Sequence, residues 1–164
     1  MNEKVIATLR SFYAGHRQQL YSYAVSITRS RESAEDAIHQ AFEQLLRRDS
    51  LPADSRPYIF RSVRNAALDG LRRDRIRSDP VLLGAGADPS EGAGYAADHC
   101  SRDIEEALQE ISPDEREAII LKIYGSLTFQ EIAAIRGVPL PTVASWYRRG
   151  LERMRTAMAR ETSR

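Results

Sequence analysis

Glycine and proline are nearly absent from residues 1–77, and this scarcity limits the fold more than any other feature of the sequence. Only Gly15, Pro52, Pro57 and Gly70 interrupt the block. Apolar residues recur there at intervals of three and four, which is the spacing of an amphipathic helix. No stretch of useful length alternates apolar and polar residues as a half-buried strand does. The first block is therefore predicted to be all-α.

Two segments of this block show the helical pattern most clearly, and the stretch LPADSRP separates them. In SAEDAIHQAFEQLL the apolar face consists of Ala34, Ile38, Ala41, Phe42, Leu45 and Leu46. In YIFRSVRNAALDGLRR the apolar face consists of Ile59, Phe60, Val63, Ala67 and Leu71. Each segment is predicted to be a helix that buries this face.

Residues 78–100, SDPVLLGAGADPSEGAGYAADHC, differ in character from what precedes them. They are rich in Gly, Ala, Pro and Asp and show no periodicity. Such a composition is typical of a flexible linker, which here is acidic. The chain is therefore predicted to hold two small helical domains, residues 1–77 and 101–164, joined by this linker.

The formal net charge of +1 conceals an uneven distribution. Residues 1–77 hold 14 Lys and Arg against 9 Asp and Glu, a net charge of +5. Residues 78–117 hold 2 against 11, or −9, and residues 118–164 hold 8 against 3, or +5. Two basic blocks flanking an acidic middle indicate contact with nucleic acid by the two ends of the chain. Two merely solvated basic faces would give the same counts.

The second domain carries explicit helix-start signals. Ser112, with Pro113 at the first helical position and Glu115 in capping-box spacing, predicts a helix that ends at Gly125. Thr128 with Glu131 repeats the signal and predicts a second helix, shorter than the first.

That short helix is predicted to end at Gly137, and the stretch VPLP then leads into a longer helix over residues 141–158. Pro141 is acceptable in the first turn, because the N–H groups there have no partner within the helix. A short helix, a turn containing glycine and a longer helix form a helix-turn-helix. Another kind of three-helix bundle would show the same elements.

The charge pattern of the last predicted helix favours the helix-turn-helix. One side of a helical wheel collects Val143, Tyr147, Leu151, Met154 and Met158. The opposite side collects Ala144, Ser145, Arg148, Arg149, Glu152 and Arg155. A helix that packs by one face and presents Ser and Arg near its beginning suits the major groove of DNA. Trp146 falls at the border, on the core side, which favours packing over contact with a sugar or a thymine methyl group.

The sequence argues against several other classes of protein. Cys100 is the only cysteine, and His16, His39 and His99 lack metal-ligand spacing, so neither a metal nor another cofactor is expected. No Gly-rich phosphate loop or clustered carboxylate pair indicates an enzyme. The N-terminus lacks a signal peptide and no stretch approaches the roughly 20 apolar residues of a membrane span. A soluble, cytoplasmic protein is expected.

Taken together, these segments resemble the extracytoplasmic-function sigma factors, the minimal two-domain initiation subunits of bacterial RNA polymerase. AEDAIHQAFEQLL is similar to region 2.2, whose D-x-x-x-Q pattern falls on Asp36 and Gln40. PYIFRSVRNAALDGLRRDR is similar to regions 2.3 and 2.4, whose R-x-x-R-N-x-x-x-D pattern falls on Arg61, Arg64, Asn65 and Asp69. LTFQEIAAIRGVPLPTVASWYRRGLERMR is similar to region 4.2, the helix-turn-helix. The order and spacing of the three make the resemblance specific.

The resemblance implies three binding sites and no catalytic residue. Core polymerase would be bound, at the clamp helices of its largest subunit, by Asp36, His39, Gln40 and Glu43. The −10 element would be bound by Tyr58, Arg61, Arg64, Asn65, Arg72 and Arg73, with Asn65 at the family position that helps to hold a flipped base. The −35 element would be bound by Thr142, Ala144, Ser145, Arg148 and Arg149. The polymerase flap and an anti-sigma factor are further partners that the family implies.

The last helix departs from the family pattern at its beginning. Region 4.2 commonly reads T-V-[KR]-S-R there, whereas this chain has Thr-Val-Ala-Ser-Trp over residues 142–146, and Pro141 replaces a frequent glycine. An unusual −35 sequence is therefore expected. The acidic linker would enter the polymerase channels as a mimic of nucleic acid, or would serve only as a soluble tether.

A free-standing helix-turn-helix regulator, with its first domain used for dimerisation or sensing, is the alternative function. The D-x-x-x-Q face and the basic R-N-x-x-x-D helix argue against it, because a sensing domain needs neither. An enzyme that processes nucleic acid has still less support.

Overall fold

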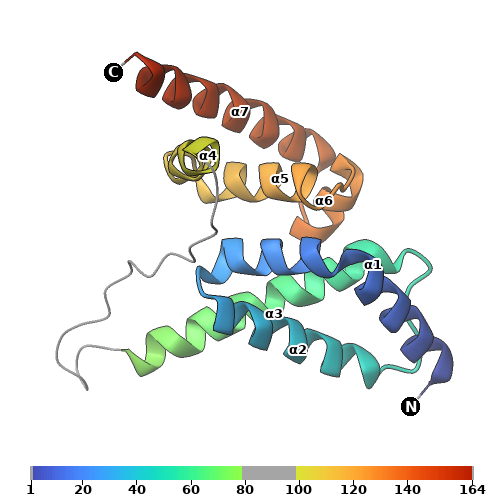
Figure 1. Ribbon diagram of the computed structural model, residues 1–164. Helices are drawn as coiled ribbons and strands as arrows, with labels where there is room; N and C mark the ends of the chain where they lie inside the picture. The colour runs from blue at the N-terminus through green and yellow to red at the C-terminus, as the bar shows by residue number, and fades with distance from the viewer. Residues whose placement is uncertain (1, 79–98, 164) are drawn as a thin grey trace. The chain divides into compact units, whose positions relative to one another are not determined.

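The computed structural model describes residues 2–78 and 99–163 (Figure 1). Within these ranges the chain forms seven α-helices and no strand, which confirms the all-α prediction. It divides into two compact units, Met1–Ala93 and Gly94–Arg164. The predicted linker, residues 78–100, lies mostly outside the described residues. At its two ends Ser78 caps one helix and the next begins at His99, two residues before the predicted second domain.

The first unit consists of three helices: α1 (Glu3–Thr28), α2 (Arg31–Leu46) and α3 (Ser55–Arg77). Helix α1 ends where Arg29 adopts a left-handed conformation with φ 55°, and its N–H bonds to the carbonyl oxygen of Val25. Ser30 then caps α2 by accepting a hydrogen bond from the N–H of Ser33. Two consecutive local signals thus reverse the chain between α1 and α2.

The core of the first unit confirms the predicted apolar faces of α2 and α3. Many of the buried side chains of the two helices are small; they are Ala34, Ala37, Ala41, Ala66 and Ala67. Phe60 is fully buried, with its ring 6.3 Å from that of Phe12 and 5.8 Å from that of Tyr23. Phe60 is therefore a core residue of α3.

The second unit consists of α4 (His99–Gln109), α5 (Pro113–Ile123), α6 (Phe129–Arg136) and α7 (Leu140–Thr162). Helices α6 and α7 are the predicted helix-turn-helix. Both predicted capping boxes are present, at Ser112 and at Thr128, with hydrogen bonds running in both directions between cap and glutamate. Gly137 closes α6 in the left-handed conformation, with φ 65°.

Two details of the second unit differ from the sequence-based expectation. Helix α5 ends at Ile123 rather than at Gly125, and the left-handed residue of the turn is Ser126, with φ 52°. Gly125 is needed for space instead, because a Cβ there would lie 2.6 Å from the carbonyl oxygen of Leu121. In addition, α4 precedes the three predicted helices.

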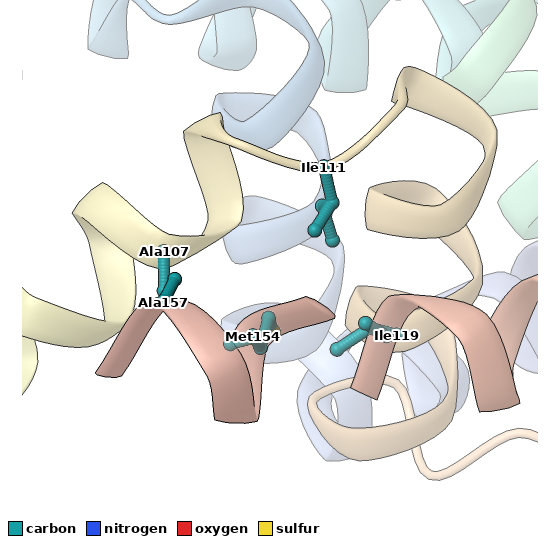
Figure 2. Packing of buried hydrophobic residues seen from close by; sticks show 5 residues of the cluster. All are labelled: Ala107, Ile111, Ile119, Met154 and Ala157. Carbon is teal, nitrogen blue, oxygen red and sulfur yellow. The ribbon is translucent and has the colours of Figure 1, made fainter. Parts of the chain in front are cut away.

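Helix α4 belongs to the core of this unit. Figure 2 shows Ala107 of α4 facing Ala157 of α7, with Met154 and Ile119 continuing the contact toward α5. Ile111, between α4 and α5, completes the buried cluster. Helix α7 is therefore held along its length by α4, α5 and α6 together.

Candidate functional site

The four residues predicted to bind core polymerase share one face of α2. Asp36, His39 and Glu43 are exposed and Gln40 is half-buried. Their spacing of three, four and seven residues aligns them along the helix, opposite the buried alanines. The structure therefore brings these side chains together on a polar surface.

Four of the residues predicted to bind the −10 element also share one face. Tyr58, Arg61, Asn65 and Arg72 fall within about 60° of the circumference of α3, at about 100° per residue. Arg61, Asn65 and Arg72 are exposed, and Tyr58 is half-buried. The guanidinium of Arg72 lies 3.7 Å from the carboxylate of Asp69, a contact between exposed groups that holds Arg72 only weakly.

The other two predicted −10 residues lie elsewhere on α3. Arg64 is half-buried and already has a partner within the protein. Arg73 faces α2, where its Nη2 donates a hydrogen bond of 2.8 Å to Oε1 of Gln40. Asn65 and Arg72 are thus better placed than Arg64 and Arg73 to meet DNA in this conformation.

The bond between Arg73 and Gln40 crosses a groove between α2 and α3. The groove has a volume of about 180 Å³, and charged side chains, among them Asp36, Asp74 and Arg77, line it. One wall of the groove belongs to the predicted polymerase-binding face and the other to the basic helix. The two predicted sites of the first unit therefore meet there.

On α7 the five residues predicted to bind the −35 element differ in exposure. Arg148 and Arg149 are exposed, whereas Thr142, Ala144 and Ser145 are half-buried. Ser145 and Arg148 lie on the side of the helix opposite the buried Val143, and Thr142, Ala144 and Arg149 flank them.

Arg149 is partly engaged by an acid beneath the helix. Glu115 of α5 is only 3% exposed, and its carboxylate accepts a hydrogen bond of 3.0 Å from Nη1 of Arg153. Nε of Arg149 lies 3.8 Å from the other carboxylate oxygen. A buried carboxylate requires such partners, because an unpaired charge there would be costly. Arg148, one position earlier on α7, is exposed.

Trp146 packs within its own unit, as its position on the wheel predicts. Its side chain is half-buried, and the guanidinium of Arg136 lies 4.8 Å from the centroid of its ring system. The same guanidinium contacts the carboxylates of Asp114 and Glu117, at 2.5 and 2.7 Å. The tryptophan that replaces a basic residue of the family pattern is thus part of the contact between α6 and α7.

Three residues that take part in these contacts could not be identified from the sequence: Arg48, Glu115 and Arg136. Arg48, in the loop before α3, lies with its guanidinium 5.2 Å from the ring centroid of Tyr58. The sequence predicts Glu115 only as a capping residue, and no sequence pattern singles out Arg136. Each makes contacts across 10 to 38 positions of sequence, which no local pattern signals.

The described residues offer neither a metal site nor a membrane-spanning helix. No group of three or more His, Cys, Asp or Glu in the described ranges could hold a metal ion. None of the helices found there combines the length and the apolar character needed to cross a membrane.

Comparisons with known proteins match both units. Residues 12–76 match the family model for sigma-70 region 2, and residues 101–154 match that for sigma-70 region 4. The ECF RNA polymerase sigma factor RpoE of Cereibacter sphaeroides is 28% identical over 133 residues, which cover 80% of this chain and 74% of that protein. The sigma factor CarQ of Myxococcus xanthus is 29% identical over 147 residues, with coverages of 87% and 84%.

One further relative and one solved structure are also similar to this chain. SigE of Mycolicibacterium smegmatis is 28% identical over 155 residues, and this chain spans 60% of its length. Among solved structures, the sigma factor RpoE of Bartonella quintana, in complex with the anti-sigma factor NepR, has a TM-score of 0.70 at 24% identity. The match covers 93% of this chain and 97% of that one, and it supports the fold.

Regions 2 and 4 in this order define a sigma factor, a subunit that directs RNA polymerase to promoters. The chain belongs to the sigma-70 family and, by its relatives, to the extracytoplasmic-function group within it. Its function is that of an alternative sigma factor in transcription initiation, a regulatory rather than a catalytic one. The free-standing regulator is not favoured, because the first unit matches region 2.

Proposed function

We propose that the exposed polar face of α2 is the surface by which this sigma factor binds core polymerase, at the clamp helices of the largest subunit. Asp36, His39, Gln40 and Glu43 supply carboxylate, imidazole and amide groups on one side of a helix whose other side is buried. This arrangement leaves Asp36, His39 and Glu43 exposed to a partner, whereas Gln40 would first have to release Arg73.

Helix α3 is proposed to bind the −10 element and to support its melting. The observation that carries this proposal is the shared exposed face of Arg61, Asn65 and Arg72. The two arginines would neutralise phosphates and make the affinity dependent on salt. The amide of Asn65 would hydrogen-bond a base flipped from the non-template strand, which offsets part of the few kcal/mol that flipping costs. Tyr58, with Arg48 on its ring, would extend this surface.

Arg64 and Arg73 take secondary roles in this proposal. Arg64 already has a partner within the protein, and Arg73 would reach DNA only after leaving Gln40. These two arginines would add to the positive electrostatic potential around α3 and would not contact DNA directly in this conformation.

Helix α7 is proposed to read the −35 element in the major groove. Ser145 and Arg148 face away from the core near the beginning of the helix, where recognition helices contact bases. Thr142 and Ala144 lie beside them, and the guanidinium of Arg149 would interact both with DNA and with the carboxylate of Glu115. The family pattern has basic residues where this chain has Ala144 and Trp146. Arg148 would therefore contribute more to recognition than either of these two positions.

The remaining partners follow from the family. Contact of the second unit with the polymerase flap, and control by an anti-sigma factor, are proposed for this chain as well. We place its activity in the cytoplasm, where bacterial RNA polymerase works, and assign the metal and the chemistry of RNA synthesis to the polymerase.

Run-off transcription with purified core polymerase, on a promoter selected from random sequence, tests the proposal. The expected result is a transcript that requires this chain and starts at one position downstream of the selected motifs. Failure to obtain such a transcript, together with no retention of core polymerase in a pull-down, would refute it. A matched control is the same reaction with a chain in which Asp36 and Gln40 are both alanine.

A further inference from the structure

Arg136 of α6 contacts both α5 and α7 near the beginning of the proposed recognition helix. It is the last residue of α6, and its side chain is only 12% exposed. Nη2 donates to Asp114 and Nη1 donates to Glu117, both on α5. The face of the same guanidinium lies against Trp146 of α7. One side chain therefore ties α5, α6 and α7 together.

The chemistry of this cluster requires arginine. A guanidinium is planar, so its edge can donate to two carboxylates while its face rests on an aromatic ring. A lysine ammonium has neither the planar face nor two separated donor nitrogens. Because both terminal nitrogens are already used and the side chain is mostly buried, Arg136 is poorly placed to bind a DNA phosphate itself.

Trp146 lies in the turn of α7 that carries the outward-facing side chains. It directly follows Ser145 and precedes Arg148 by two positions. Fixing its ring against Arg136 fixes the rotation of this turn about the helix axis. Hydrogen bonds to base edges weaken steeply with small errors in distance and angle, whereas contacts with phosphates carry no sequence information. Loss of this restraint would therefore reduce discrimination between sequences more than it reduces binding.

We propose that Arg136 is a positioning residue for −35 recognition, acting through Trp146 on Ser145 and Arg148 without contacting DNA. This inference rests on the proposed role of α7. It also gives a role to Trp146, which stands where the family pattern has a basic residue, because the tryptophan would act as an internal brace for the helix.

The test compares Arg136→Lys with Arg160→Lys, a matched substitution at an exposed position of the same helix bundle. Trp146 is the only tryptophan, so the intrinsic fluorescence of the chain reports on it alone. Arg136→Lys is expected to shift the emission to longer wavelengths and to increase quenching by acrylamide. Arg160→Lys is expected to change neither.

The second measurement is discrimination by the holoenzyme. The −35 sequence is first selected from random duplexes with the wild-type chain, and Kd is then measured for that duplex and for single-base variants of it. Arg136→Lys is expected to lower the ratio between them by about threefold to tenfold, the range that loss of a cation–π contact predicts. In a Trp146→Leu background the same substitution should have no further effect, because the residue through which it acts is gone.

The outcomes separate the inference from the proposed function. A wild-type holoenzyme that shows no −35 preference would refute the role of α7, and the inference would fall with it. A wild-type preference that Arg136→Lys leaves intact would refute the inference alone. Equal weakening of Kd for every duplex, with the ratio unchanged, would show a merely structural role and would also refute it.

Discussion

Gly150 allows α7 to approach α5 closely, and replacing it by alanine is expected to destabilise the second unit. The residue is buried within α7. A Cβ at this position would lie 2.7 Å from Cδ1 of Ile119 and 3.2 Å from Cβ of Glu115. Ile119 is only 2% exposed and belongs to one buried cluster with Ile111 and Met154 (Figure 2), so a shift of its side chain would disturb a packed core.

The expected magnitude is the difference between two effects. Replacing glycine by alanine inside a helix ordinarily stabilises it by about 1 kcal/mol. Forcing an extra methyl group into a packed core costs about 1 to 3 kcal/mol. The net result for Gly150→Ala is a loss of about 1 kcal/mol in the free energy of unfolding. Gly15→Ala is the matched control, because a Cβ there has nothing within 4 Å and keeps the favourable term alone.

Urea unfolding measures the effect. The fluorescence of Trp146, on α7, follows the second unit, and circular dichroism follows both units. With a slope of about 1 kcal/mol per molar urea, the fluorescence midpoint of Gly150→Ala should fall by about 1 M. Ile119→Val removes Cδ1 and should restore part of this loss in the double variant. A midpoint that rises for Gly150→Ala, as for a glycine in open space, would contradict the reasoning.

Three further predictions concern the proposed interfaces. Asn65→Ala should reduce promoter opening by about tenfold through the loss of a hydrogen bond, with core polymerase binding retained. Opening is measured by the permanganate reactivity of unpaired thymines, and equal losses in opening and in core binding would contradict the role of the amide. Asp36→Ala combined with Gln40→Ala should do the reverse, weakening core polymerase binding in a pull-down titration by about tenfold; unchanged binding would move the interface elsewhere. Arg148→Ala should lower the ratio of Kd between single-base variants of the selected −35 duplex and that duplex by about tenfold, and an unchanged ratio would exclude a contact of Arg148 with a base edge.

The helices could be predicted where local chemistry determines them. The capping boxes at Ser112 and Thr128 and the left-handed Gly137 depend on residues three positions apart or fewer, and the structure confirms all three. Helix α4 was not predicted although Ile104, Ala107 and Leu108 carry the helical spacing, because its beginning lacks the capping-box spacing that marks α5 and α6.

The composition of the candidate sites was only partly predictable. Exposure of Asp36 and Asn65 follows from their positions opposite apolar residues, so the pattern alone places them on the surface. The partners of Gln40 and Trp146 could not be predicted in the same way. Arg73 lies 33 positions from Gln40, and the contact of Arg136 with Trp146 depends on the angle between α6 and α7. Such contacts come from packing, which periodicity does not specify.

The bond between Gln40 and Arg73 changes how substitutions in the first unit must be interpreted. A hydrogen bond between two exposed side chains contributes about 1 kcal/mol or less, because water competes for both groups. A polymerase side chain or a DNA phosphate could therefore replace either partner at little cost. Gln40→Ala removes one proposed polymerase contact and also releases Arg73, so a gain in DNA affinity can offset a loss in core affinity within the holoenzyme. Only core binding measured without DNA isolates the contribution of Gln40, and the double substitution of Gln40 and Arg73 separates the two effects.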